Sequence, residues 1–182
     1  MENNTDLNKE ISFETFKKQV LEDYRIIVTS REASLLGRRE VLSGKAKFGI
    51  FGDGKELPQI ALAKVFQNGD FRSGYYRDQT FMMAIKELSI KQLFSGLYAN
   101  TNINEEPMSA GRQMGAHFNT PLLNSDGTWK KLIDHKNSSS DISCTGSQMP
   151  RLLGLAQASK LYRKLDFKNS KNFSKNGNEI AW

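Results

Sequence analysis

Apolar side chains recur every three or four residues through the first quarter of the chain. These positions are Phe13, Phe16, Val20, Tyr24 and Ile27. Their spacing predicts a long amphipathic helix. Ser12 is a typical N-cap ahead of it, and Gly44 is a typical residue at which a helix ends. We therefore expect residues 1–44 to form an N-terminal helical arm, whose apolar stripe packs on the core or on another subunit.

Shorter periodic segments follow the arm. They predict helices over residues 57–67, 80–86 and 90–98. Ser89 and Gln92 form a capping box at the start of the third. Pro150 suits the first turn of a further helix, which we expect to be buried along one face. That face holds Leu152, Leu155, Ala156, Ser159 and Tyr162. Residues 179–182 are typical of the start of a strand.

Two stretches lack this periodicity. Residues 70–79 place three aromatic side chains, two arginines and a glycine between two predicted helices, which is typical of a strand or loop that delivers side chains to a site. Residues 99–140 are dominated by Asn, Ser, Gly, Asp and Thr, and so long an irregular segment is uncommon as a passive linker. We expect both stretches to line a functional site or an interface.

The composition is that of an ordinary globular protein. The chain has 182 residues, of which 25% are charged and 38% hydrophobic, enough for one domain with a core. Lys and Arg number 26 against 20 for Asp and Glu, so the net charge is +6. This charge favours anionic partners such as phosphates, carboxylates or nucleic acid.

Cysteine and histidine are scarce, which excludes several kinds of site. Cys144 is the single cysteine, so the chain forms neither a disulfide within itself nor a cysteine-based metal site. His117 and His135 are too few for a histidine-rich metal centre. The polar first residues lack a signal-peptide core, and no run of 18 apolar residues would span a membrane. We expect a cytoplasmic protein with no membrane partner.

Arg77 is the leading candidate for a binding residue. Its planar guanidinium suits bidentate capture of phosphate or carboxylate, and Tyr76 beside it offers a flat wall and a hydroxyl. The alternative is a surface arginine stacked on a tyrosine. His117 follows the Gly-Arg-Gln-Met sequence at 111–114, and a histidine in a glycine-containing loop is a candidate for catalysis, although a lone histidine is more often structural.

The segment from Asp141 to Pro150 is polar, contains Gly146 and leads into a helix. Because the first turn of a helix presents free backbone amides, such a loop is a candidate site for an anion or a carbonyl oxygen. Cys144 within it is either a nucleophile or a small buried residue.

Four blocks follow one another along the chain. They are residues 44–56, Tyr-Tyr-Arg-Asp at 75–78, Gly-Arg-Gln-Met at 111–114 with His117, and the stretch from Ile142-Ser143 to Pro150 with the Ala-containing helix after it. Their order and spacing over residues 15–182 resemble the alpha subunit or alpha part of the thiamine diphosphate-dependent 2-oxo acid dehydrogenases. The Gly-Arg-Gln-Met form is closer to the branched-chain type.

This resemblance implies an α/β fold. The chain would be the helix-rich N-terminal part of a thiamine diphosphate-binding fold, truncated before most of the parallel sheet. Residues 45–182 would form the first, incomplete portion of the cofactor-binding domain.

The resemblance also assigns residues. It implies that Tyr76 and Arg77 bind the cofactor, with Arg77 holding the diphosphate, and that Ser143 contributes to the cofactor pocket. Thr145 stands where the family has a contact to the aminopyrimidine ring, commonly through an apolar residue, so its hydroxyl is a departure. His117 matches a histidine near the substrate end of the pocket, which makes it the catalytic candidate.

Two further departures concern Tyr75 and magnesium. Tyr75 stands where branched-chain relatives often have glutamine. The family's magnesium motif, Gly-Asp followed later by Asn, is absent, and the resemblance puts it beyond Trp182. The resemblance therefore assigns no metal ligand within the chain and implies that the chain alone is inactive. The glutamate that activates the cofactor belongs to the beta part.

For the whole enzyme, the resemblance implies oxidative decarboxylation of a 2-oxo acid and reductive acylation of a lipoyl group. The implied cofactors are thiamine diphosphate and magnesium. The implied partners are the beta subunit or beta part and the lipoyl-bearing acyltransferase component, within a homo- or hetero-oligomer and without nucleic acid.

The rival hypothesis is a basic module that binds RNA or phosphate without catalysis. Its stacking and phosphate-binding surface would consist of Arg72, Tyr75, Tyr76 and Arg77. The chain lacks the paired aromatic strands of a common RNA-binding module. Salt-sensitive RNA binding without any effect of thiamine diphosphate would favour this hypothesis.

Overall fold

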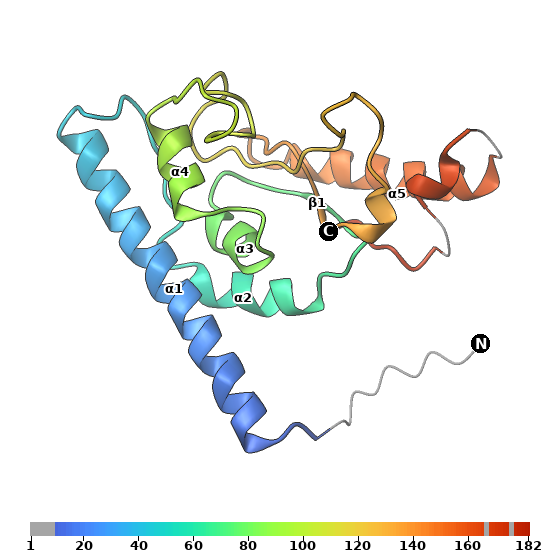
Figure 1. Cartoon of the computed structure of the whole chain (residues 1–182), viewed down its shortest axis with the longest axis horizontal. Coiled ribbons are helices and arrows are strands. Elements are labelled where there is room, and N and C mark those ends of the chain that lie inside the picture. The colour runs from blue at the N-terminus through green and yellow to red at the C-terminus, as the bar shows by residue number, and fades with distance from the viewer. Residues whose placement is uncertain (1–9, 166–167, 175–176) are drawn as a thin grey trace.

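The computed structural model describes residues 10–165, 168–174 and 177–182. A long first helix runs down one side of the molecule, and shorter helices, a small parallel sheet and another long helix follow (Figure 1). Within the described residues the fold is therefore mixed and helix-rich, with one two-stranded parallel sheet. None of the described helices combines the length and apolar character needed to cross a bilayer.

Helix α1 (Phe13–Leu42) forms where the apolar spacing predicts it. The hydroxyl of Ser12 accepts a hydrogen bond from the backbone N–H of Thr15, which satisfies one of the free amides of the first turn. The chain leaves the helix at Gly44, whose φ of +77° lies in the left-handed region that glycine adopts without strain.

The two halves of α1 differ in their surroundings. Its buried residues all lie in the second half, at Ser30, Ala33, Ser34 and Gly37. The first half extends away from the other helices (Figure 1) and exposes its apolar side chains, with Phe13 72% and Tyr24 64% accessible. Most of the predicted stripe is therefore exposed and does not pack on the core, and the residues that α1 buries are small ones outside that stripe.

Three short helices pack beside α1 and build the core. They are α2 (Glu56–Val65), α3 (Gln79–Ala84) and α4 (Ile90–Leu97), and the capping box of Ser89 and Gln92 is present at the start of α4. The largest buried apolar side chains come from these helices, from the turns between them and, for Phe118, from the irregular segment after α4. They include Phe66, Phe81, Met82, Ile85, Leu88, Leu93 and Phe118. Phe66 meets Phe81 edge to face with ring centroids 5.1 Å apart.

A buried polar cluster joins α1 to α3. The Gln79 side-chain amide donates to the Ser30 carbonyl oxygen at 2.9 Å and to the Ser34 hydroxyl at 2.8 Å. The hydroxyls of Ser30 and Thr80 lie 2.7 Å apart. Small polar residues, rather than apolar ones, form this contact between the two helices. Hydrogen bonds as well as burial therefore fix the position of α3 against α1.

Strand β1 (Phe71–Ser73) lies at the centre of the sheet region. It pairs in parallel with β2 (Asn137–Ser139), with Phe71 opposite Asn137. Ala181 forms a parallel bridge to Phe71, as expected for a strand starting at 179–182. The carboxylate of Asp70, just before β1, accepts the backbone N–H of Ile180 and the indole N–H of Trp182. The chain turns out of β1 directly into residues 75–78.

Helix α5 (Gln148–Lys164) follows the loop after β2, and two short 3-10 helices cover Leu132–Asp134 and Ser170–Asn172. The prediction that one face of α5 is buried is wrong, since no residue of this helix is buried. Ala156 is exposed, and Leu155 and Tyr162 are only half-buried. The apolar spacing indicated the right helix and the right face, but the neighbouring segments cover that face only in part.

Candidate functional site

A tight turn immediately after β1 carries Tyr76 and Arg77. The carboxylate of Asp78 accepts the backbone N–H of Tyr75 at 3.0 Å, and the backbone N–H of Asp78 donates to the Tyr75 carbonyl oxygen at 3.0 Å. This pair of bonds closes the turn at the start of α3. Tyr76 and Arg77 therefore project from a constrained backbone and are both half-buried.

The hydroxyl of Tyr76 accepts two hydrogen bonds. Tyr75 donates to it at 2.5 Å and the Arg77 guanidinium donates at 3.4 Å, and the Arg77 guanidinium carbon lies 5.3 Å from the Tyr76 ring centroid. The proton of the Tyr76 hydroxyl is thus left for a further acceptor. Arg77 has no carboxylate partner within the described part of the chain, so most of its five N–H donors are also free for a ligand.

Thr145 reaches this turn from the loop before α5. Its hydroxyl lies 3.3 Å from the Tyr75 hydroxyl. The contacts of the Tyr75 hydroxyl with those of Thr145 and Tyr76 lower the pKa of Tyr75. Tyr75 and Thr145 are two positions at which the sequence departs from the family that it resembles. Their hydroxyls contact each other.

His117 is buried and hydrogen-bonded through both ring nitrogens. Its Nδ1 lies 3.3 Å from the carbonyl oxygen of Gly115, and its Nε2 pairs with the hydroxyl of Ser143. Because a carbonyl oxygen only accepts, the neutral ring carries its proton on Nδ1 and accepts the Ser143 proton at Nε2. The Tyr76 and His117 ring centroids are 6.1 Å apart, which brings this pair beside the tyrosine turn.

The loop that presents Ser143 and Thr145 is held by Gln148, the first residue of α5. The Gln148 side-chain amide donates to the Ile142 carbonyl oxygen at 2.8 Å, and its oxygen accepts the backbone N–H of Gly146 at 3.1 Å. Gly146 has a φ of +88°, which turns the chain into the helix. Cys144 at the tip is exposed rather than buried, contrary to one of the two expectations for it.

All five predicted site residues are brought together from three segments of the chain. Tyr76 and Arg77 come from the turn after β1, His117 from the irregular segment, and Ser143 and Thr145 from the loop before α5. Other residues of the Gly-Arg-Gln-Met block are not part of this group. Arg112 is exposed, and the Gln113 amide bonds to the Ser140 hydroxyl at 2.8 Å.

Arg72 does not belong to an exposed basic surface, so that part of the RNA-binding hypothesis is wrong. Its side chain is only 4% accessible and forms an ion pair with the buried carboxylate of Asp141. Burial raises the pKa of Asp141 to about 7, against the opposite effects of Arg72 and of the Phe118 amide. Sequence reasoning missed this pair because arginine is rarely buried and the partners are 69 positions apart.

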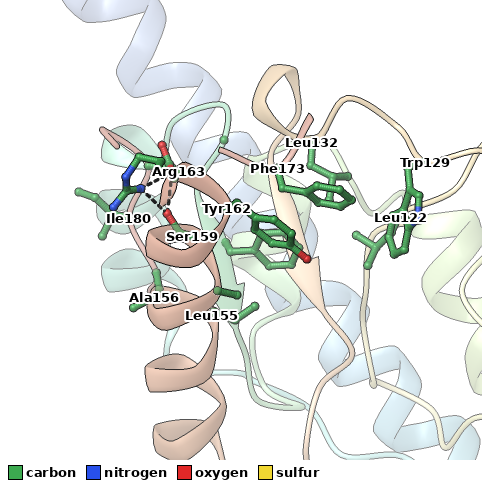
Figure 2. A pocket seen from close by; sticks show the side chains of 15 residues that line it. Leu122, Trp129, Leu132, Leu155, Ala156, Ser159, Tyr162, Arg163, Phe173 and Ile180 are labelled. Atoms are coloured by element: carbon green, nitrogen blue, oxygen red, sulfur yellow. Dashed lines mark hydrogen bonds and ion pairs between the residues drawn. The ribbon is translucent and has the colours of Figure 1, made fainter. Parts of the chain in front are cut away.

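A separate cavity of about 370 Å³ lies between α5, the loop around Trp129 and the C-terminal segment (Figure 2). Its wall is mainly apolar and aromatic, with Tyr162 and Phe173 stacked at 4.5 Å and Arg163 bonded to Glu179 at its polar end. None of the five predicted site residues lines it.

No group of three or more His, Cys, Asp or Glu side chains within the described residues is arranged to hold a metal ion. No protein-family model matches this chain, and a search of curated protein sequences finds no match.

Proposed function

We propose that this chain is the N-terminal, diphosphate-binding part of a thiamine diphosphate-dependent 2-oxo acid dehydrogenase of the branched-chain type. The observation that carries the proposal is the convergence of Tyr76, Arg77, His117, Ser143 and Thr145 around one small region, with the Arg77 guanidinium free of carboxylates among the described residues.

The donors present fit a diphosphate. Its dense negative charge requires charge-assisted hydrogen bonds, which a guanidinium supplies in a planar fork. Arg77 has free N–H donors and the Tyr76 hydroxyl has an unused proton, so both would bind phosphate oxygens. The exposed hydroxyls of Ser143 and Thr145 and the backbone before α5 would hold the rest of the cofactor. The proposal assigns no magnesium ligand to the described residues.

Thiamine diphosphate, when bound, would supply a nucleophilic carbon and a place for the charge left by decarboxylation of a 2-oxo acid. The contribution of this chain is to bind, orient and transfer protons. His117 accepts a proton at Nε2, and as an imidazolium it donates to Ser143 Oγ, so the two side chains form a short proton relay at the edge of the site. Gly115 holds the ring in the required tautomer through its carbonyl oxygen.

Calorimetric titration tests the proposal. The chain, mixed with a beta subunit of the branched-chain type and magnesium, is titrated in parallel with thiamine diphosphate, thiamine monophosphate and thiamine. We expect saturable binding in which loss of the terminal phosphate weakens affinity by about 10- to 150-fold, since a hydrogen bond to a charged group contributes about 1.5–3 kcal/mol. Equal affinity for the three ligands, or no binding, would contradict the proposal.

A titration with inorganic pyrophosphate separates this proposal from simple anion binding. Pyrophosphate shares the charge of the cofactor and lacks its rings. A phosphate-binding module would bind pyrophosphate as tightly as thiamine diphosphate, whereas a cofactor site that also holds the aminopyrimidine should prefer the cofactor.

A further inference from the structure

Arg72 lies beneath the point where the three segments of the candidate site meet. Its Nη2 donates to the carboxylate of Asp141, its Nε donates to the Ser138 hydroxyl at 3.3 Å, and its Nη1 lies 3.6 Å from an oxygen of Asp78. The guanidinium carbon is 5.6 Å from the ring centroid of Phe81, so one side of the group rests on the core. A single buried cation thus contacts β2, the tyrosine turn and the loop before α5.

Asp141 connects the same cation to the histidine segment. Its second carboxylate oxygen accepts the backbone N–H of Phe118 at 3.0 Å, and its own N–H donates to the Phe118 carbonyl oxygen at 3.0 Å. Phe118 follows His117 directly, and Ser143 lies two residues after Asp141. The two partners of the His117–Ser143 hydrogen bond therefore both extend from the Asp141–Phe118 contact.

Gly74 shows how closely the tyrosine turn rests on the guanidinium. A Cβ atom at this position would lie 1.9 Å from Arg72 Nη1, so no side chain fits between them. The Gly74 carbonyl oxygen also accepts the backbone N–H of Ile142 at 3.4 Å. The turn that carries Tyr76 and Arg77 is thereby placed directly against both Arg72 and the loop of Ser143.

Stability alone does not account for an ion pair at this place. Removing two charges from water costs about as much free energy as their attraction returns, and apolar pairs of similar size are often as stable. What the ion pair adds is a fixed geometry between the segments that it joins. We propose that Arg72 and Asp141 are positioning residues, whose buried ion pair sets the register of the tyrosine turn, His117 and Ser143 relative to one another.

The Nε2 resonance of His117 reports this geometry without any cofactor, so the test does not depend on thiamine diphosphate binding. The chain contains two histidines, and His135 is exposed and serves as the internal reference. In the ¹H–¹⁵N spectrum of the neutral imidazoles, we expect His117 to carry its proton on Nδ1, as its contacts with Gly115 and Ser143 require. Ser143→Ala defines the signal of a His117 that has lost its partner.

Three variants of the pair are compared with the parent. Arg72→Lys keeps the charge and lacks the fork that reaches two carboxylates at once. Arg72→Met removes the charge. The double variant Arg72→Met with Asp141→Leu removes both charges, and we expect it to recover much of the unfolding midpoint that the single variant loses. The introduced leucine side chain cannot accept the hydrogen bond from the backbone N–H of Phe118, so the position of His117 should not recover.

We expect all folded variants to move the Nε2 resonance of His117 to the position that Ser143→Ala gives, while the His135 signals are unchanged. A side-chain hydrogen bond is lost once its atoms are about 3.6 Å apart, so a displacement of little more than about 1 Å is enough. Retention of the parent Nε2 resonance of His117 in any folded variant, or its recovery together with stability in the double variant, would overturn the proposal. Failure of all three to fold would also overturn it, because the pair would then support the fold as a whole.

Discussion

Nε2 of His117 and the hydroxyl of Ser143 form a hydrogen bond between residues 26 positions apart. The bond joins the irregular segment after α4 to the loop before α5. His117 is buried, whereas Ser143 is exposed. The exposed hydroxyl therefore covers Nε2 of the buried imidazole and links the two segments.

His117→Asn should separate binding from chemistry. The side chain would keep a hydrogen-bonding group but lose the imidazole nitrogen that accepts the Ser143 proton. In the enzyme assembled with its beta subunit and lipoyl acceptor, we expect kcat to fall about 10²- to 10⁴-fold, the usual contribution of a general acid or base. Thiamine diphosphate affinity should change little, because Arg77 and Tyr76 are untouched. A large loss of affinity with normal kcat would assign His117 to cofactor binding instead.

Arg77→Ala should weaken thiamine diphosphate binding by about 10- to 150-fold, because a charge-assisted hydrogen bond contributes about 1.5–3 kcal/mol. Arg77→Lys should restore part of this loss, since an ammonium supplies charge without the fork. Arg25→Ala, on the exposed part of α1, removes the same charge and is the matched control. Arg72→Ala is unsuitable as a control because Arg72 is buried. Equal losses in the Arg77 and Arg25 variants would contradict the assignment.

The first half of α1 should make the isolated chain self-associate. Phe13, Phe16 and Tyr24 are 72%, 51% and 64% accessible and lie on one stripe. We expect Phe13→Gln, Phe16→Gln and Tyr24→Gln together to shift the chain towards monomer in sedimentation velocity. Leu153→Gln, at a site 73% accessible on α5, is the control for hydrophobicity alone. A parent that is monomeric at all concentrations would show this prediction to be wrong.

Glu56 should make stability depend on acid pH. The Arg31 guanidinium donates to both of its oxygens at 2.6 and 2.8 Å, and with the Gly54 amide it lowers the pKa of Glu56 to about 2. Because the folded pKa lies below the unfolded value, the stabilisation is complete above about pH 4.5 and is lost as the pH falls towards 2.

Urea unfolding measures this contribution. We expect Glu56→Gln to lower the free energy of unfolding by about 1–3 kcal/mol at pH 7, and the difference from the parent to shrink as the pH approaches 2. Glu105→Gln breaks an exposed pair with Lys91 and should change stability little, because solvent screens exposed ion pairs. A constant difference between parent and Glu56→Gln across the pH range would exclude the carboxylate as its source.

Local signals account for what the sequence could predict of the fold. Ser12 and Ser89 cap helices because their hydroxyls reach amides three residues away, and such contacts need no tertiary partner. Strand β2 escaped prediction because Asn137 and Ser138 lack the apolar alternation of a strand. Both are buried through hydrogen bonds, among them three from the Asn137 amide to carbonyl oxygens.

The site could be anticipated only in part. The resemblance singled out the five residues that lie together, although their roles remain proposals. Arg72 and Asp141 were not anticipated, because a buried ion pair depends on two distant segments meeting, and neither residue shows a local pattern. The predicted buried face of α5 failed for the converse reason: apolar spacing shows which side prefers burial, and neighbouring segments decide how much is covered.

Asp70 also determines an order of events as the chain folds. One carboxylate oxygen accepts the backbone N–H of Gln67 across a turn, whereas its bonds to Ile180 and to the Trp182 indole close loops of 110 and 112 positions. Because closing a long loop loses more chain entropy than closing a turn, we expect the turn to form before residues 180–182 pair with β1. In a Trp129→Phe background, the fluorescence of Trp182 should therefore change in the slowest refolding phase, after most helical circular dichroism has returned. Asp70→Asn should slow that phase while leaving the earlier one unchanged.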